Sequence, residues 1–138
     1  MEQRSAAPEV LREMIPFAAT VGIELLETGP DLVRGRLAWS HERTTTADVM
    51  HGGAIMTLAD TCGGVCAFLN LPDGAQGTAT VESKTNFLRA ITSGAANATA
   101  RPLHKGRSLI VVETEVTRED GKLAAKITQT QTYLYARD

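Results

Sequence analysis

The spacing of hydrophobic residues changes along this chain, and each change marks an expected element. Residues 54–69 are apolar or small almost all the way round at helical spacing. A helix without a polar side belongs inside a protein, and this one is short for crossing a bilayer. We therefore predict a central buried helix over 52–69. Its narrow polar stripe, spaced i, i+3, i+4 and i+7, consists of Thr57, Asp60, Thr61 and Gly64.

Alternation with a period of two predicts strands on both sides of this helix. Before it, residues 23–28 and 32–39 form a predicted hairpin that turns at Gly29-Pro30-Asp31. After it, we expect four strands joined as consecutive hairpins, over residues 77–87, 95–104, 108–117 and 123–135. Long antiparallel strands behind one buried helix make an α+β fold.

The remaining segments are expected to be a short helical region and a loop. Residues 1–21 form the predicted N-terminal helical segment, in which Pro8 suits a helix start and Pro16 is expected to break or kink the helix. Residues 40–50 have no period and are expected to form a loop that leads to the central helix.

Composition narrows the class of protein. The chain has 138 residues, of which 43% are hydrophobic, so we predict one domain over 1–138. A net charge of -2 gives no electrostatic basis for binding nucleic acid. Residues 1–10 lack the basic start and apolar core of a signal peptide, and no membrane segment is expected. The chain is therefore expected to be cytoplasmic.

Histidines and cysteines do not predict a metal site. His41, His51 and His104 are not spaced as ligands. Cys62 and Cys66 lie one turn apart on the predicted central helix without a nearby histidine, which is typical of small buried thiols. We expect no metal and no redox cofactor.

Two features of the central helix suggest chemistry. Gly52 and Gly53 begin it without side chains, so backbone N–H groups and the positive end of the helix dipole are open to an oxyanion. Asp60 is a carboxylate within an apolar helix, where it needs hydrogen bonds or water. It is either a structural residue bonded to Thr57 or Thr61, or a general base or nucleophile.

These two features are too far apart to act together within one chain. Gly52 and Asp60 are eight residues apart, which is about 12 Å along a helix. Both groups must lie within about 3 Å of the reacting atoms. Two antiparallel copies of the helix meet this requirement, so we predict an active site shared across a two-fold homodimer interface.

The motif around the helix resembles a known family. His51-Gly52-Gly53, an acid nine residues after the histidine, and a later strand ending Asn86-Phe87-Leu88-Arg89-Ala90 resemble the hotdog-fold acyl-CoA thioesterases, PaaI-type and 4-hydroxybenzoyl-CoA thioesterase groups. The resemblance spans residues 20–135. It implies a long antiparallel sheet wrapped around one central helix.

The resemblance also implies roles for individual residues. The Gly52 N–H would donate to the thioester oxygen, and Asp60 of the partner subunit would be the base or nucleophile. A strand hydroxyl, placed at Thr80 in preference to Thr78, would orient the water. Gly53 and Thr61 would contact the substrate.

Two positions near the helix start leave alternatives open. Thr45 lies six residues before His51, where many relatives carry Asn or Gln. Because a hydroxyl cannot mimic an amide, the substrate or the rate is expected to differ. His51 is either a catalytic base or a residue that fixes the local turn by hydrogen bonds. The second role is favoured because no matching nucleophile is apparent.

Coenzyme A carries phosphates, so its site should offer cations. The candidates near strand ends or turns are Arg89, Lys105 and Arg107, together with Lys84. The Gly106-Arg107 turn is preferred, because a glycine lets backbone N–H groups approach a phosphate. Each cation could instead be a solvated surface residue.

The sequence therefore predicts a thioesterase that cleaves an aryl or short to medium acyl-CoA into the free acid and CoA. We expect a homodimer with shared sites, and the family resemblance implies a dimer of dimers. The competing hypothesis is a non-catalytic acyl-CoA-binding or regulatory protein on the same fold.

Overall fold

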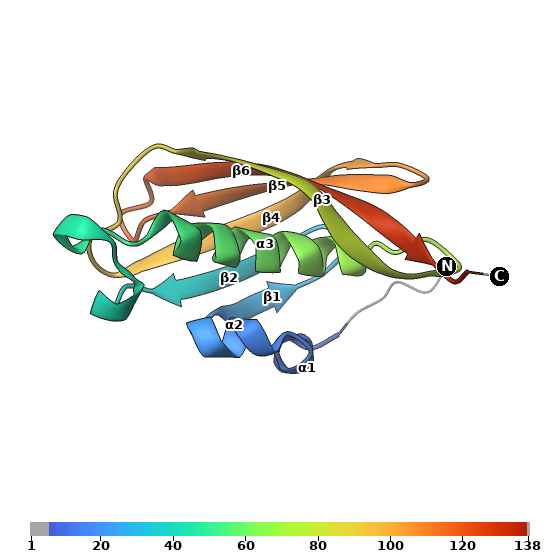
Figure 1. Cartoon of the computed structure of the whole chain (residues 1–138), viewed down its shortest axis with the longest axis horizontal. Helices are drawn as coiled ribbons and strands as arrows, with labels where there is room; N and C mark the ends of the chain where they lie inside the picture. Colours follow the sequence, from blue (N-terminus) through green and yellow to red (C-terminus); the bar gives the residue numbers. More distant parts are fainter. Residues whose placement is uncertain (1–5, 138) are drawn as a thin grey trace.

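An antiparallel sheet of six strands curves around one long helix (Figure 1). The computed structural model of the chain describes residues 6–137. The helix is α3 (Gly52–Phe68). The strands are β1 (Glu24–Thr28), β2 (Val33–Ala38), β3 (Ala75–Phe87), β4 (Ala95–Lys105), β5 (Leu109–Thr117) and β6 (Leu123–Tyr135). The expected α+β class and the wrapped helix are both confirmed.

Two short helices precede the sheet, and each begins at a proline. They are α1 (Pro8–Glu13) and α2 (Pro16–Val21), so the predicted break at Pro16 is confirmed. Residues 1–5 of the predicted helical segment lie outside the described residues. None of the helices described within residues 6–137 has the length and apolarity needed to cross a membrane.

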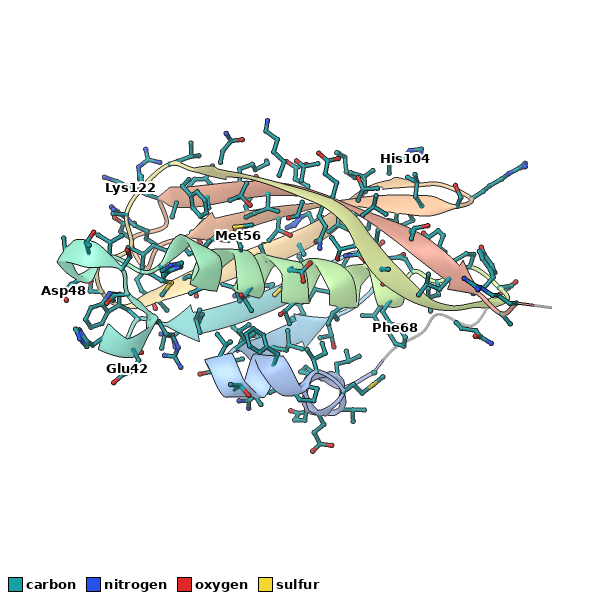
Figure 2. All side chains as sticks on the ribbon, viewed as in Figure 1. Glu42, Asp48, Met56, Phe68, His104 and Lys122 are labelled. Carbon is teal, nitrogen blue, oxygen red and sulfur yellow. The ribbon has the colours of Figure 1, made fainter. Side chains whose placement is uncertain are left out.

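The stretch before α3 is more ordered than the expected loop. It contains two 3-10 turns, η1 (His41–Arg43) and η2 (Thr46–Asp48), which lie at the end of the molecule where α3 begins (Figure 2). Trp39 Nε1 donates a hydrogen bond to Asp48 O at 2.9 Å. Residues 40–50 have no regular hydrophobic period, so the sequence pattern did not predict these local contacts.

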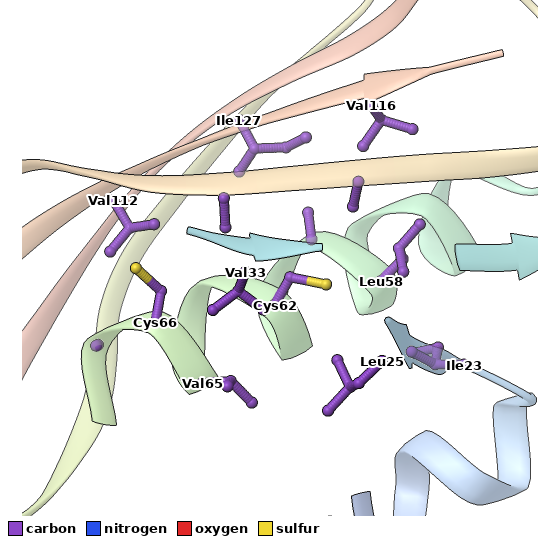
Figure 3. Close-up of a cluster of buried hydrophobic side chains, with 14 of the residues drawn as sticks. Ile23, Leu25, Val33, Leu58, Cys62, Val65, Cys66, Val112, Val116 and Ile127 are labelled. Carbon is purple, nitrogen blue, oxygen red and sulfur yellow. The ribbon is translucent and has the colours of Figure 1, made fainter. Parts of the chain in front are cut away.

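The core forms where one side of α3 packs on the sheet. Leu58, Cys62 and Cys66 are fully buried and face strand residues such as Val112 (Figure 3). Gly35 on β2 permits this close approach, because a Cβ built there would lie 2.5 Å from Cys62 Sγ. The apolar pattern of residues 54–69 therefore corresponds to side chains that α3 buries against the strands.

The opposite side of α3 is open in the single chain. Asp60 is exposed, and Met56, one turn before it, is 41% exposed. The predicted burial of the helix is therefore confirmed on the side that packs on the sheet, whereas its polar stripe is exposed or half-buried in the single chain. The physical reason is that one sheet covers only one side of a helix, and the polar stripe lies on the other.

The order of the strands corrects one expected hairpin. Along the sheet the order is β1-β2-β4-β5-β6-β3, so β3 pairs with β6 and β2 pairs with β4. The predicted hairpin between residues 77–87 and 95–104 is wrong, whereas the hairpins β1–β2, β4–β5 and β5–β6 are confirmed. Alternation identifies strands without specifying their neighbours, and β3 crosses to the far edge.

A bulge at Val81 changes which side chains of β3 face the helix. Thr80 pairs with Gln131 and Glu82 pairs with Thr130, so one extra residue stands between them on β3. An extra residue reverses the inward and outward positions that follow it. Regular alternation would put Thr80 and Lys84 on one face, but across the bulge Thr80 faces the helix and Lys84 points to the opposite side.

The buried thiols give a testable consequence of this packing. Burial raises the pKa of Cys62 and of Cys66 to about 12, against an ordinary value of 9.0. Because the thiolate is the reactive form, we expect both thiols in the folded protein at pH 8 to react at least about 10²-fold more slowly with a disulfide reagent than after denaturation. Absorbance of the released aromatic thiol measures the rate.

The same shift predicts an alkaline limit. Stability from the neutral buried thiols is fully present below pH 9 and is lost as the pH rises from 9 toward 12. Rapid labelling of either cysteine in the native protein at pH 8 would contradict the described packing of α3.

Candidate active site

The first turn of α3 leaves one backbone donor open. His51 is the N-cap, and its Nδ1 accepts a hydrogen bond from Gly53 N–H at 2.8 Å. The Gly52 N–H, the first of the helix, has no acceptor within residues 6–137. Of the two glycines that begin the helix, Gly52 is therefore the one whose N–H can bind a ligand oxyanion.

His51 has the geometry of the predicted turn-fixing residue. Its backbone N–H donates to Arg43 O at 2.8 Å, and its carbonyl accepts from Ala54 N–H at 2.9 Å. Because Nδ1 accepts a bond, the ring proton of the neutral imidazole lies on Nε2. The side chain thus caps the helix and aligns the neighbouring Gly52.

A hollow of about 370 Å³ opens beside Gly52. Thr45 and Arg89 line it, and so does Phe87, whose ring packs so close that a Cβ at position 52 would lie 3.1 Å from Phe87 Cζ. Arg89 is held by a 2.7 Å hydrogen bond from its Nη1 to Leu123 O. Among the predicted residues, the structure brings Gly52, Thr45 and Arg89 together.

A second hollow of about 520 Å³ lies on the other side of the same turn. Its lining includes Gly53, His51, Thr57 and Phe17. Thr57 Oγ1 donates to Gly53 O at 2.8 Å, so this hydroxyl is not the partner of Asp60. The helix start therefore presents two separate recesses, one on each side of its axis.

Asp60 lies farther along α3, in a cluster of uncharged polar groups. Its Oδ1 accepts hydrogen bonds from Thr80 Oγ1 at 3.1 Å and from Gln129 Nε2 at 2.5 Å. Gln131 Nε2 donates to Thr80 Oγ1 at 2.6 Å. No hydrogen bond to Asp60 Oδ2 occurs within the described part of the chain. An exposed carboxylate with one oxygen held and the other open can accept a proton or attack a carbonyl.

Sequence reasoning missed the two glutamines of this cluster. Gln129 is fully buried and Gln131 is 2% exposed, and both point inward from β6. The sequence contained an indication of them, because the two amides occupy alternating positions on the same strand face as Ile127 and Tyr133. A polar residue at a repeated inward position needs a partner.

The chain does not bring Gly52 and Asp60 together. Neither hollow at the helix start is lined by Asp60. Thr61, the next residue, is half-buried on the same stripe.

On this side of the molecule β3 is the last strand of the sheet, so its outer edge carries no paired strand in the described chain.

The predicted phosphate-binding turn lies at the other end of the molecule from Gly52. Lys105 ends β4 near His104, far from the helix start marked by Asp48 (Figure 2). Lys105 Nζ is 3.7 Å from Asp31 Oδ1, and the Gly106 N–H already donates to Leu109 O at 2.8 Å. The donor expected to meet a phosphate is therefore occupied within the turn that also contains Arg107.

Residues 6–137 contain no group of three or more His, Cys, Asp or Glu side chains placed to hold a metal ion. The polar groups of the candidate site are the open Gly52 N–H and the carboxylate, hydroxyl and amides of the Asp60 cluster. Together they can support acyl transfer to water, provided that the carboxylate and the N–H reach the same carbonyl.

Comparisons with known proteins point in the same direction. Residues 47–125 match the family model of the thioesterase superfamily. The proofreading thioesterase EntH of Cronobacter turicensis is 29% identical over 102 residues, covering 74% of each protein. A protein of Saccharolobus solfataricus is 40% identical over 101 residues, which are 73% of this chain and 69% of that protein.

Solved structures extend the similarity to the whole fold. A thioesterase of Haemophilus influenzae superposes with a TM-score of 0.90 at 25% identity, covering 99% of this chain and 96% of that one. The PaaI protein of E. coli superposes with a TM-score of 0.83 at 20% identity over 91% and 89% of the two chains, which shows a shared fold.

The cap at the helix start makes a prediction about stability. Replacing His51→Ala leaves the Gly53 N–H without its acceptor, so we expect a loss of about 0.5–2 kcal/mol in the free energy of unfolding. Urea denaturation followed by circular dichroism measures it. The control is His41→Ala, because the His41 side chain is 82% exposed. This substitution should change the free energy of unfolding by less than about 0.5 kcal/mol. Equal effects of the two changes would contradict the capping role.

Proposed function

This chain belongs to the thioesterase superfamily and is a thioester hydrolase, and from that premise we propose that its substrate is an acyl-CoA. The proposal includes cleavage of an aryl or short to medium acyl group from CoA. One observation carries it: α3 presents an open Gly52 N–H at its first residue and an exposed, hydrogen-bonded Asp60 eight residues later.

The proposed active site is formed by two copies of the chain. Within one chain the two groups lie about 12 Å apart along a straight helix. Two antiparallel copies of α3 would place the Gly52 of each beside the Asp60 of the other. A second copy would have to bind at the exposed side of α3 and at the outer edge of β3, which pairs with no strand within residues 6–137.

In the proposed reaction, the thioester oxygen accepts a hydrogen bond from Gly52 N–H, which stabilises the negative charge of the tetrahedral intermediate. Asp60 of the second copy removes a proton from water as the water oxygen bonds to the carbonyl carbon. The carbon–sulfur bond then breaks, and the CoA sulfur takes up the proton. The free acid and CoA are the products.

An alternative route uses the same residues. The Asp60 carboxylate attacks the carbonyl, CoA leaves, and water opens the resulting anhydride. Thr80 supports either route, because its hydroxyl donates to Asp60 Oδ1. In the proposal Thr80 orients the water through Asp60, because its one proton is donated to the carboxylate. Contact of Thr61 with the substrate is also part of the proposal.

Arg89 is the proposed cation for the phosphates of CoA. It lines the hollow beside Gly52, together with Thr45. A guanidinium can bind phosphate oxygens through two parallel hydrogen bonds. Thr45 offers a hydroxyl at the same rim, so the contact there differs from one made by an amide side chain.

The substrate class is tested with a panel of CoA thioesters. Benzoyl-CoA, butyryl-CoA, hexanoyl-CoA and palmitoyl-CoA are incubated with the purified protein, and thiol release is followed by absorbance. We expect turnover of the aryl or the shorter acyl thioesters. Binding of these compounds without thiol release from any of them would contradict the acyl-CoA hydrolase proposal.

The role of Asp60 makes a direct prediction. Asp60→Asn keeps the size of the side chain and removes its basicity, so we expect kcat to fall at least about 10²-fold. Affinity for the acyl-CoA should remain, because the oxyanion donor and the hollow beside Gly52 are unchanged. Steady-state thiol release and calorimetric binding measure the two quantities.

The matched control is Asp73→Asn, the same chemical change at an exposed turn residue outside the cluster. It should retain the kcat of the unmodified protein. If Asp60→Asn also retained that kcat, the proposed mechanism would be wrong.

A further inference from the structure

Gln129 is a buried polar residue whose amide lies beside Asp60. Its side chain is fully buried on β6, on the same inward face as Ile127 and Tyr133. Its Nε2 donates to Asp60 Oδ1 at 2.5 Å and reaches Thr80 Oγ1 at 3.3 Å. Its Oε1 has no hydrogen-bond partner within residues 6–137. The chain therefore keeps a costly buried amide whose one satisfied end points at Asp60.

The neighbouring helix makes room for this amide. Gly63 lies three residues after Asp60 on α3 and is buried. A Cβ at this position would collide with Gln129 Oε1. The absence of a side chain at Gly63 thus allows the amide to lie against the helix and reach the carboxylate.

A second arm of hydrogen bonds ends on the same carboxylate oxygen. Gln131 Nε2 donates to Thr80 Oγ1 at 2.6 Å, and Thr80 Oγ1 donates to Asp60 Oδ1 at 3.1 Å. A hydroxyl has one proton to donate, so this bond commits the Thr80 proton to Asp60. Both arms therefore fix Oδ1, and neither occupies Oδ2.

We propose that Gln129 is a positioning residue that holds Oδ1 of Asp60, so that Oδ2 is the oxygen presented to the attacking water or to the thioester carbonyl. The inference rests on the proposed function, because it assumes that Asp60 reacts. A neutral amide fixes the carboxylate through geometry and places no positive charge beside it. A cation at that place would compete with the proton that Asp60 has to accept.

The first test replaces Gln129→Met, which keeps the length of the side chain and removes its donor. We expect kcat to fall about 10- to 100-fold, the change that corresponds to losing one hydrogen bond to a charged group. KM should change by less than about twofold, because Gln129 acts through Asp60 and does not touch the substrate. Benzoyl-CoA and hexanoyl-CoA are the probes, and thiol release gives both constants.

Two variants separate positioning from general packing. Thr114→Val also removes a buried polar group from the inward face of the sheet, and Thr114 Oγ1 has no partner within the described residues. It should leave kcat unchanged. Gln131→Met leaves both bonds to Asp60 in place and should lower kcat less than Gln129→Met does.

A double-mutant cycle gives the measurement that a merely structural role would not satisfy. If Gln129 acts through Asp60, Gln129→Met should cause no further loss of the residual kcat in the Asp60→Asn protein. A further loss equal to that in the unmodified background would overturn the inference. So would a Gln129→Met protein with a lower Tm and an unchanged kcat.

The outcomes also distinguish the proposed role of Gln129 from the proposed function of Asp60. Loss of activity in Asp60→Asn with full activity in Gln129→Met overturns the role of Gln129 alone. Full activity in Asp60→Asn overturns the proposed function, and the positioning role with it. Thermal unfolding of each variant shows whether the protein assayed was folded.

Discussion

A straight α-helix keeps the Gly52 N–H and the Asp60 carboxylate about 12 Å apart, because eight residues each add about 1.5 Å. No side-chain rotation closes that distance within one chain. The rest of the structure is consistent with a site that a second copy of the chain completes. One side of α3 packs on the sheet through Leu58 and Cys62, and the other side stays open. The edge of β3 beside it also lacks a paired strand in the described chain.

The two halves of the proposed site are positioned by different parts of the chain, and both depend on hydrogen bonds made by polar side chains. At the helix start, His51 occupies the Gly53 N–H and so leaves the Gly52 N–H as the open donor. In the middle of the helix, Thr80 and Gln129 hold one oxygen of Asp60. In each case a polar side chain satisfies one group completely and leaves its neighbour available for chemistry, which is how a site is preorganised.

Much of this arrangement could be predicted because it depends on local pattern. The helical period of residues 54–69, the break at Pro16 and the Gly52-Gly53 helix start are written in neighbouring residues. The bond from Gln129 to Asp60 could not be found in this way, since Gln129 lies 69 positions away on β6. The face of Lys84 could not be predicted for a similar reason: the bulge at Val81 appears only when the two strands are aligned.

Mixed dimers test the shared site most directly. Gly52→Pro removes the N–H at a helix position that accepts proline, and the extended His51 backbone suits the residue before it. Purified Gly52→Pro and Asp60→Asn subunits should each be nearly inactive. After the two are unfolded and refolded together, half the dimers contain one intact Gly52 facing one intact Asp60, so about a quarter of the unmodified activity should return. A mixture no more active than either variant alone would contradict a site shared between two chains.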